Sequence, residues 1–538
     1  MFSLPGRVIL IASLLVLLAM PASAQDLRGL VDALGKGGFA ETEQAIYDLA
    51  ATGDPEVAPV LRALQENDLV VRKMDGRVFR AERGGAGYTI YDVFTGEQVG
   101  QLARSAVERV RVNNNLRRVI GSAVAVLTLH SPEPHRRARA ADTLVDQPDP
   151  AMLAALDDAI AAEQVSAIRA RMEQARAAIL LAPDSDATES ERISAVEMIA
   201  QRGDRDALVI LEGVRDRVDG EIAAAAERGI ADVERAIALR DAAQNVWYGI
   251  SLGSVLLLAA IGLAITFGVM GVINLAHGEM VMLGAYVTFV VQSVLQAYAP
   301  GLLEASVLIA IPVAFLVAGA VGIAIERGVI RFLYGRPLET LLATWGLSLI
   351  LQQAVRTIFG STNRQVTAPD WISGAFDFYG LTITWNRLYI VIFALIVFAS
   401  LVCLLRYSSF GLRVRAVTQN RRMAGSMGIR TPWVDAMTFG LGSGIAGMGG
   451  VALSQIDNVS PNLGQNYIVD SFMVVVFGGA GNLWGTLVGA FTLGVANKFL
   501  EPYAGAVLGK ILVLVFIILF IQRYPRGLFA LKGRAGEA

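Results

Sequence analysis

Residues 246–279 read VWYGISLGSVLLLAAIGLAITFGVMGVINLAHGE, and the first charged side chain in this stretch is Glu279. A helix needs about 20 mostly apolar residues to cross a bilayer, so the stretch is long enough to span one. Further charge-free runs follow it almost to the end of the chain: 280–303, 305–325, 340–355, 388–405, 436–456, 471–497 and 511–522. The run 471–497 is interrupted by glycines and divides into two helices. The sequence therefore predicts an all-α polytopic membrane bundle of about nine segments over residues 246–530, followed by a cytoplasmic tail, 531–538.

The rest of the chain has a different composition. Residues 25–245 carry a net charge of −10, whereas residues 246–538 carry +7, and with Arg7 these give the −2 of all 538 residues. The mean hydropathy of +0.51 thus averages a soluble acidic part and a membrane part. No basic block is interleaved with aromatic residues, which excludes a typical nucleic-acid-binding protein.

The first 24 residues have the pattern of a secretory signal peptide. Arg7 precedes an apolar run, and the small residues Ala22-Ser23-Ala24 form a typical cleavage site. An uncleaved membrane anchor is the alternative, and either would export residues 25–245. The one cysteine, Cys403, cannot form an intrachain disulfide, so the exported domain must be held together by its own core.

The exported domain, residues 25–245, is predicted to be mainly helical. Apolar residues recur at helical spacing over 27–64 and 136–240, in pairs separated by Asp- and Gly- or Pro-containing turns. This pattern is similar to a degenerate HEAT-type repeat, with an ordinary helical bundle as the alternative. Residues 69–100 predict a small β insert that begins with a hairpin closed by a two-residue turn. His130 and His135 do not make a convincing metal site, and no catalytic group is evident.

Arginine and lysine residues predict the orientation of the membrane segments. If the N-terminal domain is periplasmic, 13 positive charges fall in cytoplasmic loops and the tail, against five outside. This asymmetry agrees with the positive-inside rule. The sequence therefore predicts a multi-pass protein of the bacterial inner membrane, in contact with membrane lipid and with a periplasmic N-terminal domain.

Two polar turns interrupt the apolar segments. The first contains Asn274, His277 and Glu279, and the second consists of Gly478, Gly479, Ala480, Gly481 and Asn482. Polar groups at membrane depth are costly and usually mark a pathway or a broken helix. We interpret Asn274, His277, Glu279, Gly478, Gly479, Gly481 and Asn482 as translocation-path candidates; simple capping turns are the alternative.

A third motif lies in the predicted cytoplasmic loop 410–429. It combines apolar residues at helical spacing with several arginines, and its candidate docking residues are Gly411, Arg413, Arg415, Asn420, Arg421, Arg422 and Gly428. Such a segment suits a short helix that lies against a partner. A solvated, positively charged loop is the alternative.

The order of these motifs resembles a known family. Asn274–Glu279, Gly411–Ile429, Ser460–Gly464, Gly478–Asn482 and Tyr524–Phe529 together look like the permeases of branched-chain amino acid (Liv-type) ABC transporters. The long exported domain is not typical of the amino acid permeases and is similar to that of the urea ABC transporter permease subunit of the same family.

The resemblance implies several partners: a second permease subunit, two cytoplasmic ATPase subunits and a periplasmic solute-binding protein. It also implies that Gly411–Ile429 is the coupling helix that docks on an ATPase. The sequence contains no G-x-x-x-x-G-K-[ST] motif, since Gly505–Ile511 has the wrong spacing. We therefore expect no enzymatic activity, cofactor or metal in this chain itself.

The function expected from the resemblance is import of urea or a short-chain amide. The nearest alternative is a branched-chain amino acid permease, although a zwitterionic solute should need a charged partner in the path. A membrane receptor with a periplasmic sensor domain is an alternative of another class. The tail after Gln522 is short for the output domain that such a receptor needs.

Overall fold

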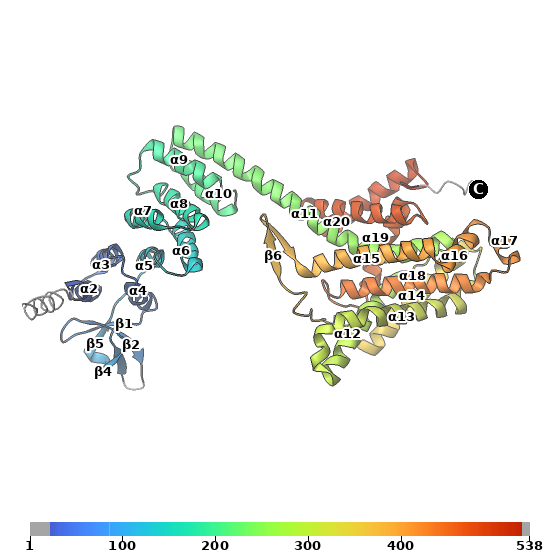
Figure 1. The fold of residues 1–538 in the computed structure, drawn as a ribbon, viewed down its shortest axis with the longest axis horizontal. Coiled ribbons are helices and arrows are strands. Elements are labelled where there is room, and N and C mark those ends of the chain that lie inside the picture. The colour runs from blue at the N-terminus through green and yellow to red at the C-terminus, as the bar shows by residue number, and fades with distance from the viewer. Residues whose placement is uncertain (1–21, 85–86, 530–538) are drawn as a thin grey trace, which may run out of the picture. The chain divides into compact units, whose positions relative to one another are not determined.

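The computed structural model describes residues 22–84 and 87–529. The chain forms two compact units, Met1–Ala238 and Leu239–Ala538, which we call the N-terminal unit and the C-terminal unit (Figure 1). Most of the predicted signal peptide, 1–24, and all of the predicted tail, 531–538, lie outside the described residues. The division between the units falls inside one long helix, slightly before the boundary predicted at residue 245.

The N-terminal unit is built mainly from consecutive helices, several with capped starts. Thr188 and Glu191 form a reciprocal capping box, and the side chains of Asn113 and Asp204 accept hydrogen bonds from the first turns of their helices. The elements are α2 (Ala22–Ala33), α3 (Phe39–Ala51), α4 (Val57–Gln65), α5 (Asn114–Thr128), α6 (Pro134–Asp146), η2 (Pro150–Met152), α7 (Leu153–Ala162), α8 (Ser166–Leu180), α9 (Glu189–Ala200), α10 (Arg205–Arg215) and the start of α11 (Glu221–Met270).

The predicted β insert is present and extends beyond residue 100. It is a five-stranded antiparallel sheet of order β4-β3-β2-β1-β5, made of β1 (Leu69–Arg72), β2 (Val78–Arg83), β3 (Gly87–Tyr91), β4 (Gln98–Ala103) and β5 (Val107–Arg109), with η1 (Arg104–Ala106) before the last strand. The predicted two-residue turn is wrong. Val71 pairs with Val78, and five residues separate the end of β1 at Arg72 from the start of β2. Arg72 bonds Asp75 within this turn, and Gly76 has a φ of 70°.

A single hydrophobic core runs through the helices of the N-terminal unit. Its buried residues extend from Val31 to Val233, and the inner strand residue Leu69 belongs to it. Neighbouring helices such as α5 and α6, or α6 and α8, pack on each other to enclose this core. The HEAT-like character of the helix pairs stays a prediction.

One buried ion pair should make the stability of the N-terminal unit depend on pH. The Arg137 side chain donates to both carboxylate oxygens of Glu163, at 2.6 and 3.1 Å, and only 2% of the Glu163 side chain is exposed. The hydrogen bond from Arg137 holds the pKa of Glu163 below its ordinary value of 4.5. The pair therefore contributes stability above pH 4.5, and this contribution is lost as the pH falls through the lowered pKa.

We expect Glu163→Gln to lower the melting temperature of residues 25–238 by several degrees at neutral pH. The difference from the wild type should shrink as the pH falls below 4.5, because the wild-type carboxyl then becomes protonated too. Circular dichroism melts across this pH range measure both effects. Glu234→Gln, at an exposed position of α11, is the matched control and should change little. A difference that did not vary with pH would contradict this role of the Glu163 carboxylate.

The C-terminal unit is a bundle of long apolar helices. Among the residues that the structure describes, six helices are long and apolar enough to cross a membrane, and α19 is a shorter apolar helix. The elements are α11 (Glu221–Met270), α12 (His277–Tyr298), η3 (Pro300–Ala305), α13 (Ser306–Gly328), η4 (Ile330–Phe332), α14 (Pro337–Phe359), the hairpin strands β6 (Ala375–Phe378) and β7 (Leu381–Thr384), α15 (Trp385–Tyr407), α16 (Ser409–Gln419), α17 (Arg421–Ser426), α18 (Thr431–Leu453), α19 (Leu463–Gly478) and α20 (Leu483–Arg523).

Each predicted apolar run lies mainly on one of these helices, although the helix ends differ. The first run was predicted to continue to residue 278, but α11 ends at Met270 because Gly271 adopts a φ of 66°. The run 471–497 divides between α19 and α20, and its second part shares α20 with the run 511–522. This element is interrupted at Gly505 by a φ of 76°. The count of nine crossings stays a prediction.

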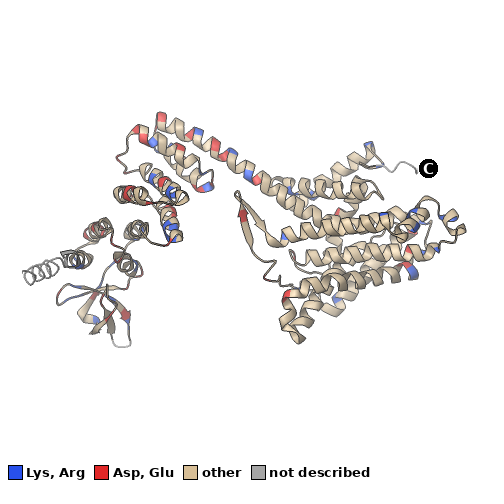
Figure 2. Cartoon of the chain, viewed as in Figure 1, with Lys and Arg blue, Asp and Glu red and all other residues tan. Residues whose placement is uncertain are grey.

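The distribution of charged side chains differs between the two units of the structure, as it does between the two parts of the sequence. Figure 2 shows them spaced along the helices of the N-terminal unit, and largely gathered near helix ends in the C-terminal unit. The helices α12, α13 and α18 pack most closely on one another. This distribution is the one expected for helices whose middle parts face lipid or each other.

Glycines of α18 allow its close approach to α13. A Cβ atom on Gly447 would lie 2.7 Å from the Cβ of Ala318 and 2.8 Å from the carbonyl oxygen of Ala314. Small residues are favoured between membrane helices because they permit close backbone packing. By contrast, a Cβ on Gly346 of α14 would meet no described atom within 4 Å.

We expect Gly447→Val to destabilise the C-terminal unit by about 1–3 kcal/mol, the usual cost of overpacking a close contact. Gly346→Val has the same chemistry at an open position and is the matched control. Thermal unfolding of the detergent-purified protein measures both. An equal loss in the two variants would show that the effect comes from the loss of glycine and not from the α13–α18 contact.

Candidate functional site

The first polar turn lies between α11 and α12 and is deeply buried. Asn274 is in the non-helical connection that Gly271 begins, and His277 and Glu279 are in the first turn of α12. Their exposed fractions are 2%, 1% and 1%. The three predicted path residues are therefore brought together inside the bundle, in a region where an unpaired polar group is costly.

Each of these three side chains keeps an unpaired polar atom. The Nε2 atom of His277 lies 2.9 Å from the carbonyl oxygen of Ala259, but Nδ1 has no hydrogen-bond partner among the described residues. The side-chain oxygen of Asn274 also has none. Gly262 makes room for the imidazole ring, since a Cβ there would lie 2.7 Å from the His277 Cε1 atom.

The carboxylate of Glu279 is held by two side chains from α14. Its Oε1 atom accepts hydrogen bonds from Ser348 Oγ at 2.8 Å and from Gln352 Nε2 at 2.7 Å. Its other oxygen, Oε2, is buried and has no hydrogen-bond partner in the part of the chain that the structure describes. Buried polar groups are normally paired, so an unpaired carboxylate oxygen is a candidate contact for a ligand.

The buried face of α14 is polar, which sequence reasoning missed. Thr340, Thr344, Ser348 and Gln352 recur every four residues and are 0–4% exposed. Several large apolar residues of the helix are exposed instead, among them Leu341, Leu342, Trp345, Leu349 and Ile350. The spacing of four in the run 340–355 is the sequence signal that could have identified this stripe as one helix face.

The second polar turn serves mainly to connect α19 to α20. Gly479 and Gly481 have φ values of 103° and 81°, which favour glycine. Asn482 caps α20 by accepting hydrogen bonds from the backbone N–H groups of Trp484 and Gly485. The Asn482 amide also donates to the carbonyl oxygen of Phe529 at 3.2 Å.

The same turn packs against the chain after α20. The N–H groups of Leu528 and Phe529 donate to the carbonyl oxygens of Phe477 and Gly478. Gly478 also fits closely against Gly485. The structure thus joins the 478–482 motif to the 524–529 motif. Among the described residues, the hydrogen bonds and close backbone contacts of this second turn do not involve Asn274, His277 or Glu279.

The predicted coupling stretch forms two short helices, α16 and α17. They divide at Asn420, whose side chain accepts a hydrogen bond from the N–H of Met423. Gly411 fits tightly against the backbone of Leu405, and Gly428 has a φ of 85°. These residues shape the segment. The side chains of Arg413 and Arg422 are exposed and make no ion pair with any described residue.

A cleft connects this segment to the second polar turn. It has a volume of about 690 Å³ and is lined by residues of α11, α15, α16 and the start of α20, including Arg406, Arg415, Asn482 and Trp484. The side chain of Arg415 also donates to the carbonyl oxygen of Leu405. Predicted path and predicted coupling residues therefore share one cleft.

A buried network attaches α17 to the membrane helices. Arg421 pairs with Asp435 of α18, which is 0% exposed, and its guanidinium carbon lies 4.9 Å from the centre of the Tyr334 ring. Tyr334 donates to Glu326 Oε1 at 2.8 Å. Burial, together with the nearby Asp435 carboxylate, raises the pKa of Tyr334 well above its ordinary value. Its hydroxyl therefore stays protonated and remains a donor.

The match to a known protein family lies in the C-terminal unit. Residues 245–521 match the model of the branched-chain amino acid transport system permease component family. The high-affinity branched-chain amino acid transport system permease protein LivH of Salmonella typhimurium is 32% identical over 294 residues, which is 53% of this chain and 94% of LivH. Its Escherichia coli counterpart is 31% identical with the same coverage.

A more distant relative is also named as a permease protein of a branched-chain amino acid transport system. The permease protein BraD of Pseudomonas aeruginosa is 28% identical over 292 residues, covering 53% of this chain and 94% of BraD. No solved structure matches the chain. The family match extends over more than half of the sequence. This chain therefore belongs to the permease component family of the branched-chain amino acid transport system.

Proposed function

We propose that this chain is the membrane-spanning permease subunit of an ATP-driven importer. The match of residues 245–521 to the permease component family supports this proposal. The observation that carries it is the buried polar cluster of Glu279, Ser348 and Gln352, which joins two helices and keeps an unpaired carboxylate oxygen. A polar contact site between packed helices is what a solute path through a bundle requires.

The proposed subunit works with a second permease, two cytoplasmic ATPases and a periplasmic solute-binding protein. The exposed side chains of Arg413, Arg422 and Met423 support docking of α16 and α17 on an ATPase. The excess of positive charge in this loop supports a cytoplasmic location. In this arrangement, the N-terminal unit is exported to the periplasm after its signal peptide and the C-terminal unit lies in the inner membrane.

Urea or a short-chain amide is the proposed solute. Such molecules are neutral and carry N–H donors, whereas the cluster offers the acceptors Glu279 Oε2 and Asn274 Oδ1. An acceptor that is left unpaired inside a protein gains most from a donor-rich solute. The N-terminal unit lies outside the region that matches the family, and its resemblance to the extension of urea permeases also supports this choice.

A branched-chain amino acid is the second candidate, favoured by the names of the relatives. It is also favoured by two opposite charges, Glu279 on α12 and Arg356 on α14. Arg356 follows Gln352 by about one helical turn and donates to Asn462 Oδ1 at 2.6 Å. Glu279 could bind the ammonium group of an amino acid and Arg356 its carboxylate.

Uptake into reconstituted vesicles tests the proposal. We expect labelled urea to accumulate only when the ATPase partners and ATP are present. Uptake that persisted without the ATPases would contradict the importer. If labelled leucine accumulated in this way and labelled urea did not, the amino acid would replace urea as the solute while the importer proposal stood.

A further inference from the structure

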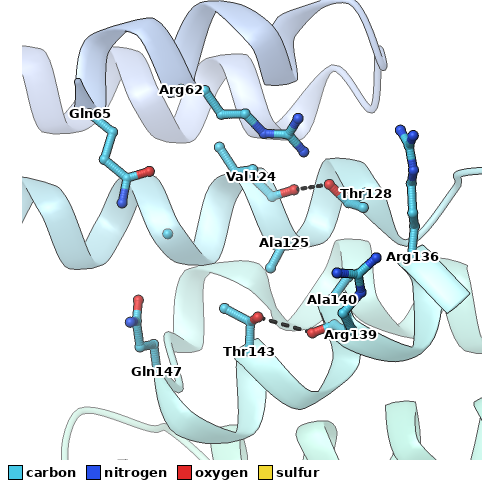
Figure 3. A pocket seen from close by; sticks show the side chains of 11 residues that line it. Arg62, Gln65, Val124, Ala125, Thr128, Arg136, Arg139, Ala140, Thr143 and Gln147 are labelled. Atoms are coloured by element: carbon cyan, nitrogen blue, oxygen red, sulfur yellow. Dashed lines mark hydrogen bonds between the residues drawn. The ribbon is translucent and has the colours of Figure 1, made fainter. Parts of the chain in front are cut away.

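The N-terminal unit contains a cavity to which the proposed transport function gives no role. Its volume is about 550 Å³, within the range of small-molecule sites, and it lies between α4, α5 and α6 (Figure 3). Its polar lining residues include Arg62 and Gln65 from α4 and Arg136, Arg139, Thr143 and Gln147 from α6 and its end. Three arginines therefore surround one cavity.

The positive charge of this cavity is largely uncompensated. Arg136 pairs with Glu133 at 3.0 Å, but Arg62 and Arg139 form no ion pair with any residue that the structure describes. By contrast, Arg137 and Arg202 of the same unit are paired with carboxylates. Two unpaired guanidinium groups in a concave site create a positive potential that favours an anion.

The remaining lining suits a small ligand. The side-chain oxygen of Gln147 is buried without a hydrogen-bond partner among the described residues, so it can accept from a protonated group of the ligand, such as the hydroxyl of hydrogen phosphate. Thr128 and Thr143 already donate their hydroxyl protons to the carbonyl oxygens of Val124 and Arg139, at 2.6 and 3.0 Å, so the arginines are the donors that the cavity offers to an anion. Gly121 and small apolar side chains, including Ala125, line the same cavity and leave it open.

We propose that this cavity binds a small anion with two negative charges, either a dicarboxylate or a phosphate. Arg62 and Arg139 would each hold one acidic group, or together one phosphate, because the planar guanidinium fork matches the oxygens of both groups. Arg136 would add a third donor from the start of α6. The site is in the N-terminal unit alone and is independent of the solute that the C-terminal unit carries.

Isothermal titration of the full-length protein in detergent tests this site, with inorganic phosphate and succinate as separate probes. We expect saturable binding of at least one probe that weakens as salt is added. Because two charge-assisted contacts are lost, Arg62→Gln/Arg139→Gln should weaken this binding at least about tenfold. The control Arg83→Gln/Arg104→Gln removes two exposed arginines outside the cavity and should leave binding unchanged.

The two probes distinguish the sources of the anion, since tighter binding of phosphate or of succinate identifies the class. Both arginines of the test pair lie on the surface of their helices, and unchanged melting without ligand shows that the variant is folded. Absence of saturable binding of either probe would overturn the proposal. So would binding that survived Arg62→Gln/Arg139→Gln, or equal binding of neutral succinamide.

Discussion

Glu279→Gln should reduce solute uptake at least about tenfold while leaving the amount of protein in the membrane almost unchanged. The substitution keeps the shape of the side chain but replaces one acceptor oxygen of a buried carboxylate with an N–H₂ group. Hydrogen bonds to a charged group contribute about 1.5–3 kcal/mol, and about 1.4 kcal/mol corresponds to a factor of ten. The solute loses such a contact if it binds Glu279 Oε2. Initial uptake rates in reconstituted vesicles measure the loss.

Glu339→Gln is the matched control for this substitution. Glu339 is also near the start of a helix, but its side chain is 56% exposed and pairs with Arg336 at the surface. We expect wild-type uptake from this variant, because exposed pairs contribute little. Ser348→Ala and Gln352→Ala should reduce uptake less than Glu279→Gln, since each removes only one donor to Oε1. Wild-type uptake by Glu279→Gln would place the solute path elsewhere.

Much of the fold could be predicted because hydrophobicity and charge decide it locally. The apolar run after residue 246 is a helix, and the glycines at 478–481 separate α19 from α20. The end of α11 at Met270 was not predicted, because it depends on the backbone conformation of Gly271 within a run that stays apolar. The turn before β2 was also missed, since the Arg72–Asp75 contact that supports a longer turn is a feature of the folded chain.

The candidate site could be predicted only in part. Asn274, His277 and Glu279 stand out as polar residues next to glycines in an apolar stretch, and the structure buries all three. Their partners Ser348 and Gln352 lie about 70 residues away in a helix whose polarity looks unremarkable by composition. The network around Tyr334 was missed for the same reason, because it joins residues from three separate segments. Local sequence patterns do not show which side chains pair with each other across the bundle.

Arg421→Met should disrupt the junction between α17 and α18 and abolish most ATP-driven uptake. Asp435 is fully buried, and without Arg421 it loses its ion-pair partner. Removing one partner of a buried ion pair costs about 3–5 kcal/mol. Because 41% of the Arg421 side chain is exposed, water screens part of the interaction, and we expect a cost of about 3 kcal/mol. Thermal unfolding of the detergent-purified protein measures this loss.

The double variant Arg421→Met/Asp435→Leu separates stability from coupling. Apolar replacement of both partners often restores stability, so we expect its melting temperature to return close to that of the wild type. The ion pair that joins α17 to α18 remains absent, and the Tyr334 ring also loses the cation that lies over it. If this link carries ATPase movement into the bundle, the double variant should transport less solute for each ATP hydrolysed. The exposed pair Arg336–Glu339, replaced in the same way, is the control and should keep the wild-type ratio. A wild-type ratio in Arg421→Met/Asp435→Leu would show that the pair only stabilises the fold.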